Sequence, residues 1–169
     1  MNHYAFTASH MQALPVNLRA LIGKYFAGSR WQETCDFYNA LPERYRATVC
    51  FHAGLKKRHT VIFLHELNDA DRECLVNALD ELRKAFAKHR RHEVGNIAYL
   101  QRLTISERKT LFMHAGLTAA EFNQPLWRID DAGCQWRGTL LTAIRELITI
   151  FDDAPTILTA IKPEAYISN

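Results

Sequence analysis

The sequence contains the same short phrase twice. LPERYRATVCFHAGL at 41–55 and LTISERKTLFMHAGL at 103–117 share seven of fifteen positions and lie 62 residues apart. A second pair of segments, LVNALDELRKAF at 75–86 and LLTAIRELITIF at 140–151, aligns at an offset of 65. Because a unit of about fifty residues struggles to bury its apolar faces alone, two such units predict an internally duplicated domain, with helix-turn-helix-like units at 37–86 and 99–151.

The spacing of apolar residues predicts α-helices throughout. In the middle of the chain Leu75, Leu79 and Leu82 recur at three- and four-residue intervals, and only TVIFLHEL at 60–67 competes as a strand. We therefore predict an all-α fold of about eight or nine helices in a single domain, 1–169. Its parts are N-terminal helices in 1–36 (two helices, roughly 15–27 and 30–41), a basic first unit at 37–92, a second unit at 93–153, and a C-terminal tail or helix at 154–169.

Helix ends are marked by glycine and helix starts by capping boxes. Gly54 and Gly116 follow the repeated phrase at the point where each helix should end, because glycine enters the left-handed conformation without a steric penalty. Thr104 and Thr118 each precede a glutamate by three residues, the spacing that satisfies free amide hydrogens at a helix start. Each HAGL is thus predicted to end one helix before another begins.

Composition bounds the setting of the protein. The chain of 169 residues, 48% hydrophobic, can bury a core without staples. Neither a signal peptide nor an apolar run long enough for a membrane span is visible, and the cysteines lie in apolar or helical segments that suit reduced core thiols. We expect a protein of a reducing cytosol that does not contact membranes. The cysteines are Cys35, Cys50, Cys74 and Cys134.

Basic residues gather in the first unit. Residues 37–92 hold 11 Lys and Arg against 7 Asp and Glu, whereas residues 93–169 hold 7 against 9. Many of these basic residues stand in two runs, at 56–59 and at 83–91. Cations at the end of a helix complement its dipole, so the second run also has a purely structural explanation. If the two runs adjoin, they predict a phosphate-binding patch. Its residues are Lys56, Lys57, Arg58, His59, Arg83, Lys84, Lys88, Arg90 and Arg91.

The HAGL turns invite comparison with a DNA-binding helix-turn-helix, in which a small residue and a glycine let two helices meet at a sharp angle. KKRH opens the segment after the first turn, whereas TAAE, with its acidic residue, follows the second, so the first copy is the better candidate for groove binding. The alternative is that HAGL only closes a helical hairpin.

Catalytic and metal-binding signatures are absent from the sequence. It contains no glycine-rich phosphate loop, no nucleophile elbow and no Cys-x-x-Cys or His-Glu-x-x-His pattern. His52 and His114 occupy matched positions near helix ends, where we expect each to bond a terminal carbonyl. We predict no enzymatic activity, no metal and no cofactor. The bulky aromatic residues of the second unit, together with Trp31, are expected in the core: Trp127, Trp136, Phe122 and Phe151.

Three stretches between Asn17 and Phe86 carry a resemblance: NLRALIGKYFAG, RATVCFHAGLKKRH and HELNDADRECLVNALDELRKAF. They resemble a family of small proteins carried by enterobacterial phages and prophages. The resemblance covers residues 17–86, leaves out the second unit, and transfers no functional residues. It implies an accessory protein of a mobile element in a bacterial cytoplasm.

Together these observations predict a small, non-enzymatic, nucleic-acid-binding regulatory protein of phage or mobile-element type. Its partner is DNA or RNA, bound through the basic first unit. The alternative is a protein-interaction module that binds and modulates a host protein through an apolar face of the second unit. Both hypotheses allow a homodimer.

Overall fold

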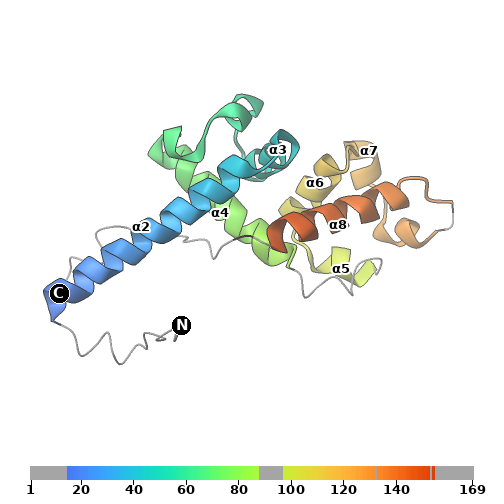
Figure 1. Ribbon diagram of the computed structural model, residues 1–169. Helices are drawn as coiled ribbons and strands as arrows, with labels where there is room; N and C mark the ends of the chain where they lie inside the picture. The colour runs from blue at the N-terminus through green and yellow to red at the C-terminus, as the bar shows by residue number, and fades with distance from the viewer. Residues whose placement is uncertain (1–14, 88–96, 132, 153, 155–169) are drawn as a thin grey trace.

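A computed structural model describes residues 15–87, 97–131, 133–152 and 154, with the side chains of 19–30 and 97 excepted. Helices make up this part of the chain, and it contains no strand, so the all-α prediction is confirmed (Figure 1). The helices in chain order are α2 (Val16–Ala40), α3 (Glu43–His52), η1 (Lys57–Val61), η2 (Leu64–Glu66), α4 (Asp69–Ala85), α5 (Ile97–Arg102), α6 (Ile105–His114), α7 (Ala119–Phe122), η4 (Leu126–Asp130) and α8 (Arg137–Asp152).

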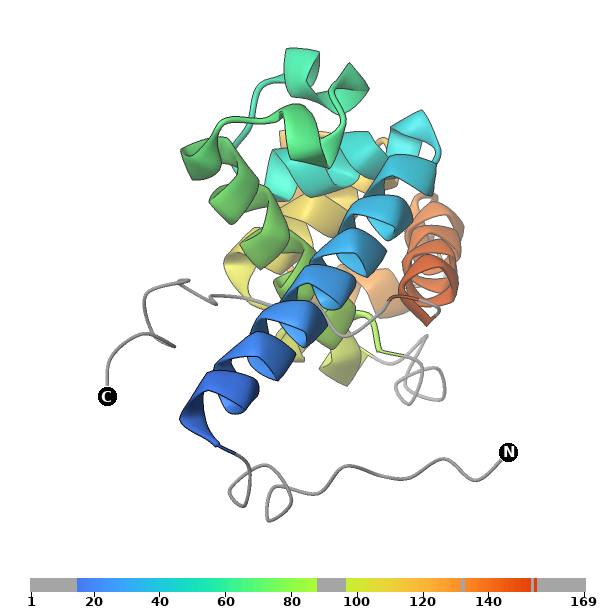
Figure 2. The same cartoon turned by 60° about the vertical axis from the view of Figure 1, so that its left-hand side comes forward.

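The N-terminal region forms one long helix where the sequence predicted two. α2 runs for 25 residues through Gly28 and Ser29, the predicted gap. A glycine inside a helix costs only about 1 kcal/mol relative to alanine, and no proline stands between Val16 and Ala40 to interrupt the hydrogen bonds. The last turns of α2 pack on the other helices and bury Cys35 and Tyr38, while its N-terminal half projects away from them (Figures 1 and 2).

The TVIFLHEL segment is not a strand. It spans the end of η1, the whole of η2 and the residues around them. The two short 3₁₀ helices bury Thr60 and Leu64, and Leu67, which follows η2, is buried as well. The apolar residues of TVIFLHEL therefore supply the inward-facing side chains of these short turns, and they do not form a strand. Asn39 of α2 anchors η2, since its side-chain oxygen accepts a hydrogen bond from the Leu64 amide at 3.0 Å.

The core lies where α3, α4, α6 and α8 meet. α3 packs against α6 and α4, and α8 packs against α6 and α4. α4 and α8 each bury one apolar stripe at helical spacing, as the sequence predicted. Residues that align between the two units are buried alike, with Leu75 and Leu140, Ala78 and Ala143, Leu82 and Leu147, and Phe86 and Phe151 all at most 4% exposed. Such equivalence is what the predicted duplication requires, although the duplication itself stays a prediction.

Both HAGL phrases close their helices in the same way. Gly54 and Gly116 have φ of 73° and 74°, the left-handed region. The amide of the following leucine reaches back to the helix in each copy, Leu55 to the Cys50 carbonyl and Leu117 to the Phe112 carbonyl, both at 2.9 Å. This is the Schellman arrangement of a helix C-terminus, so the predicted glycine stops are confirmed. The capping boxes at Thr104 and Thr118 are confirmed as well.

These glycines give a direct test of the helix stops. A Cβ at Gly54 or Gly116 meets no atom within 4 Å, so the cost of Gly→Ala is conformational, about 1–2 kcal/mol at each site. Gly138 in α8 also has open space but lacks a positive φ, so Gly138→Ala should stabilise by about 0.4–1 kcal/mol. Urea unfolding of the three variants measures both effects. Equal effects at all three glycines would contradict the left-handed caps.

Candidate functional site

Three cations of the predicted patch stand together in the turn after the first HAGL. Lys56 precedes η1, and Lys57 and Arg58 form its first residues. All three are exposed, and their side chains make no ion pair with any other described residue. We call residues 56–58 the basic turn. It concentrates three uncompensated charges at the surface beside the N-terminal end of α4 (Figure 1).

His59, the fourth residue of this run, has a structural part. It is mostly buried, its Nδ1 lies 3.1 Å from the Lys56 amide nitrogen, and its Nε2 lies 3.6 Å from an Asp71 carboxylate oxygen. It therefore holds η1 against α4 and offers little of its surface to a ligand.

The second basic run is partly neutralised. Arg83 and Lys84 both pair with Asp80, whose side chain is only 8% exposed, and the Arg83 distance is 3.1 Å. These two charges compensate a buried carboxylate. Lys88, Arg90 and Arg91 lie outside the described residues.

The structure does not bring the described parts of the two runs together. η1 contacts α4 at Asp71, whereas Arg83 and Lys84 stand in the last turn of that helix. Twelve residues of α-helix separate Asp71 from Arg83, an axial distance of about 18 Å. The basic turn is thus a surface of its own.

The segments after the HAGL turns are too short for the predicted groove-binding helices. The first is η1, five residues of 3₁₀ helix where the sequence predicted an α-helix, and the second is the four-residue α7. In η1 the chain turns tightly so that Thr60 is buried and the cations remain outside. A recognition helix that spans a major groove is therefore absent from these two places.

A hydrogen-bond network at the centre of the molecule was missed by the sequence analysis. Thr48 of α3 contacts His114 of α6 at 2.7 Å from Oγ1 to Nδ1, and Thr110 of α6 contacts His52 of α3 at 2.8 Å. These two pairs are reciprocal, because the threonines align with each other and so do the histidines. Both imidazole side chains are at most 1% exposed.

Glutamates from α4 and α8 complete this network. His52 Nε2 lies 2.8 Å from Glu81 of α4, and His114 Nε2 lies 3.1 Å from Glu146 of α8. The expectation that each histidine bonds a terminal carbonyl was therefore wrong, although its structural role was correct. The recurrence of threonine, histidine and glutamate at aligned positions was the signal that could have revealed the network.

Arg44 makes the two halves of the network unequal. Its guanidinium lies 3.0 Å from Glu146 and donates to the His114 carbonyl at 2.9 Å, and the aligned residue of the second unit is Ser106. Burial and the Arg44 charge lower the pKa of His114, with Glu146 opposing them. A neutral His114 has one ring proton. Because the Glu146 carboxylate can only accept, that proton belongs on Nε2. The single hydroxyl hydrogen of Thr48 is then shared between His114 Nδ1 at 2.7 Å and the Arg44 carbonyl at 3.0 Å.

An apolar hollow opens beside the second HAGL turn. It has a volume of about 300 Å³, and Phe51 of α3 forms one wall while α6 and α7 form the others. Phe51 is 47% exposed. We call this hollow the Phe51 groove, and its lining consists of Phe51, Lys109, Phe112, Met113, Leu117, Thr118, Ala119 and Phe122.

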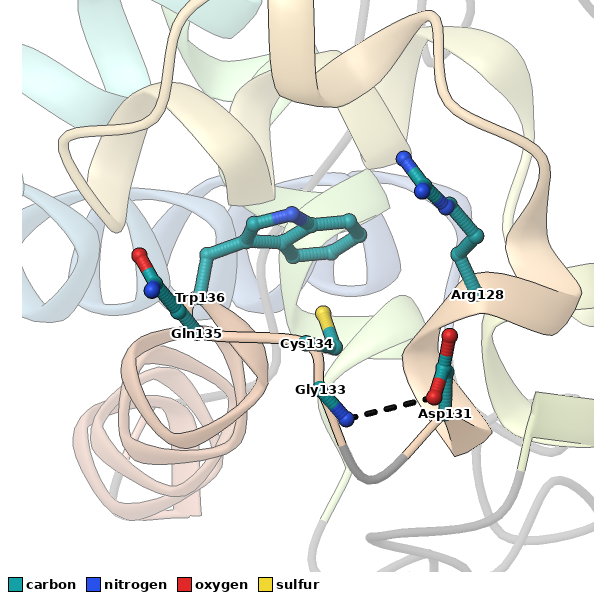
Figure 3. A pocket seen from close by; sticks show the side chains of 6 residues that line it. All are labelled: Arg128, Asp131, Gly133, Cys134, Gln135 and Trp136. Carbon is teal, nitrogen blue, oxygen red and sulfur yellow. Dashed lines mark hydrogen bonds between the residues drawn. The ribbon is translucent and has the colours of Figure 1, made fainter.

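A second pocket, of about 380 Å³, lies where the second unit carries three additional residues (Figure 3). Trp136 and Arg128 line its opposite sides, and Asp131 accepts a hydrogen bond from the Gly133 amide at 3.2 Å. Trp136 also packs on Phe112 of the core. Its lining mixes a guanidinium, a carboxylate, a thiol and an indole and selects no single ligand class.

The expected aromatic core of the second unit is only partly found. Phe151 is buried, and Trp136, Phe122 and Trp31 are half-buried against the core. Trp127 is 65% exposed, so its prediction was wrong. It stands in the short η4, whose inward position is filled by Ile129 instead.

The four cysteines are distributed over different elements of the fold. Cys35 and Cys50 are buried, Cys134 is half-buried and Cys74 is exposed, and all four are free thiols. Within the described ranges, no group of three or more His, Cys, Asp or Glu side chains is placed to hold a metal ion. None of the helices described is both long enough and apolar enough to cross a membrane.

Comparison with protein families identifies the chain. A family model described as the phage replication gene B protein family matches residues 2–168. The chain belongs to this family. The match confirms the resemblance to phage proteins and extends it from residues 17–86 to both units of the gene B protein fold. No solved structure matches the chain.

The buried histidine of α6 gives a prediction for pH. In the unfolded chain His114 takes up a proton as the pH falls through about 6.5, whereas the folded protein, with its lowered pKa, resists protonation. The free energy of unfolding should therefore fall below pH 6.5, with a contribution of at most one proton, about 1.4 kcal/mol per pH unit. Urea unfolding at pH 7.5, 6.5 and 5.5 measures the slope.

His114→Gln should be less stable at pH 7.5 and should lose less stability on acidification than the wild type. The control is His65→Gln, because His65 is exposed, and this variant should keep the wild-type slope. An unchanged slope in His114→Gln would show that other groups cause the acid sensitivity.

Proposed function

We propose that this member of the phage replication gene B family is a non-enzymatic accessory protein that binds nucleic acid through the basic turn, in the cytoplasm of the infected bacterium. The observation that supports the proposal is the cluster of three adjacent exposed cations, Lys56, Lys57 and Arg58, without ion pairs to described residues. In a phage replication family, the phosphate backbone is the natural counter-charge for such a cluster.

The contrast with the second basic run strengthens this choice. Arg83 and Lys84 are already committed to Asp80, so a phosphate that approached them would compete with an existing carboxylate. The basic turn has no such competitor among described residues, and its charges are fully available. Lys88, Arg90 and Arg91 remain predicted contributors.

Aromatic exposure beside the basic turn favours single strands. Phe63, directly between η1 and η2, is 44% exposed and stacks on the His65 ring with centroids 5.8 Å apart. Bases of single-stranded nucleic acid stack on exposed aromatic rings while cations bind the backbone. The turn and this ring pair lie within seven residues of each other in sequence.

The shortness of η1 argues against base-specific recognition in the major groove. A five-residue 3₁₀ helix cannot present side chains along a major groove, so the contacts proposed here are to phosphates and unstacked bases. We accordingly expect binding that depends weakly on sequence and strongly on salt.

The proposal predicts a steep loss of affinity with salt. Three phosphate contacts give a slope of about −2.7 on duplex DNA, so the binding constant should fall roughly 40-fold between 50 and 200 mM salt. Electrophoretic mobility shifts with random duplex DNA, single-stranded DNA and RNA measure this. Absence of binding to all three at 50 mM salt would refute the proposed function.

A charge-matched pair of variants locates the site. Lys57→Glu/Arg58→Glu should weaken binding at least tenfold and reduce the duplex salt slope by about 1.8, because two phosphate contacts are lost. Arg128→Glu/Arg145→Glu changes the net charge equally at exposed positions of the second unit and should bind like the wild type. Equal losses in both double variants would indicate that overall charge, rather than the basic turn, drives binding.

A further inference from the structure

The Phe51 groove leaves apolar surface uncovered at the meeting of the two units. Phe51 is 47% exposed although its neighbours Val49 and Cys50 are almost fully buried. The fold therefore gains only part of the stabilisation that full burial of a phenylalanine side chain provides. The ring borders an open hollow of about 300 Å³. A contiguous apolar surface around a hollow marks a place for another molecule.

The shape of the groove suits side chains of a protein. Its volume lies at the lower limit of ligand pockets, about 300–1,000 Å³, so it has no room for a large cofactor. Phe51, Phe112, Met113, Leu117 and Phe122 dominate its lining, and methionine adapts to varied apolar shapes. An amphipathic helix inserts apolar anchors into a groove of this type at positions i, i+3 or i+4, and i+7.

One charge determines what kind of helix fits. Lys109 is the only charged residue among the eight that line the groove, and its Nζ lies 5.9 Å from the centre of the Phe122 ring. The nearby carboxylate of Glu121 is bonded to the Thr118 amide at 2.8 Å, and this bonding with Thr118 lowers its pKa. Its negative charge is thus directed to a helix start, and the ammonium of Lys109 is the charge that a ligand in the groove meets.

We propose that the Phe51 groove binds an amphipathic helix of a partner protein, with apolar anchors against Phe51 and Met113 and an acidic side chain on Lys109. A nucleic-acid strand suits this surface poorly, because a single cation among apolar side chains cannot neutralise a row of phosphates. The lining of the groove and the basic turn share no residue, so this inference does not depend on the proposed nucleic-acid binding.

Two synthetic peptides test the charge preference. Both are 18-residue helices with leucine and phenylalanine at i, i+4 and i+7, and one has glutamates flanking this stripe where the other has lysines. Titration calorimetry with the full chain should give at least tenfold tighter binding of the acidic peptide, and amide NMR shifts should concentrate at Phe51, Met113 and Leu117. Equal affinities, or shifts centred elsewhere, would overturn the proposal.

Reversal of the groove charge is the sharper test. Lys109→Glu should invert the preference, so that the lysine peptide binds tighter than the glutamate peptide. The side chain is exposed, so the substitution should leave the thermal unfolding midpoint close to that of the wild type. A variant that still prefers the acidic peptide would exclude Lys109 as the selecting residue and would overturn the proposed geometry.

Two phenylalanines of similar exposure allow the groove and the basic turn to be tested separately. Phe51→Ser should weaken the acidic peptide at least tenfold and leave nucleic-acid binding unchanged. Phe63→Ser, at 44% exposure against 47%, should leave peptide binding unchanged. Peptide loss in both variants would overturn the groove assignment, whereas failure of nucleic-acid binding alone would affect only the proposed function. Sedimentation completes the test, because a dimer that Phe51→Ser dissociates would make a second copy the occupant and overturn the acidic-helix proposal.

Discussion

The fold depends on two reciprocal hydrogen bonds between α3 and α6, one between Thr48 and His114 and one between Thr110 and His52. All four groups are removed from water, and a buried polar group without its partner costs about 1–3 kcal/mol. A shift of α3 along α6 by one turn would break both bonds at once. The pairing therefore fixes the register of these helices far more tightly than apolar contacts could.

The same pairing determines what the surface presents. Because His52 and His114 face inward, their preceding residues Phe51 and Met113 lie about 100° around each helix and line the groove. The glutamates of α4 and α8 then bind the far nitrogens of the rings and tie the two long helices to the central pair. The buried polar network and the apolar Phe51 groove are thus both consequences of the register between α3 and α6.

Local signals in the sequence were sufficient for the helical class, the glycine stops and the capping boxes, because each of these depends on a few adjacent residues. Continuity of α2 through Gly28 was not predictable from local propensity, since a glycine weakens a helix without ending it. The partners of His52 and His114 lie 58 and 66 residues away in the chain, beyond any local pattern. Trp127 was misplaced because composition alone cannot tell which side of a short 3₁₀ helix faces the core.

Differences between the two aligned units indicate where function resides. Positions that hold the units together agree, as Thr48 and His52 do with Thr110 and His114. Positions at the surface diverge, with Lys56 and Lys57 replaced by Thr118 and Ala119 in the second unit. The first unit consequently carries free charge after its turn, whereas the second carries an apolar wall of the groove. A common helical frame thus carries exposed cations on one unit and an apolar groove wall on the other, and these are the two features on which the proposed nucleic-acid and helix contacts rest.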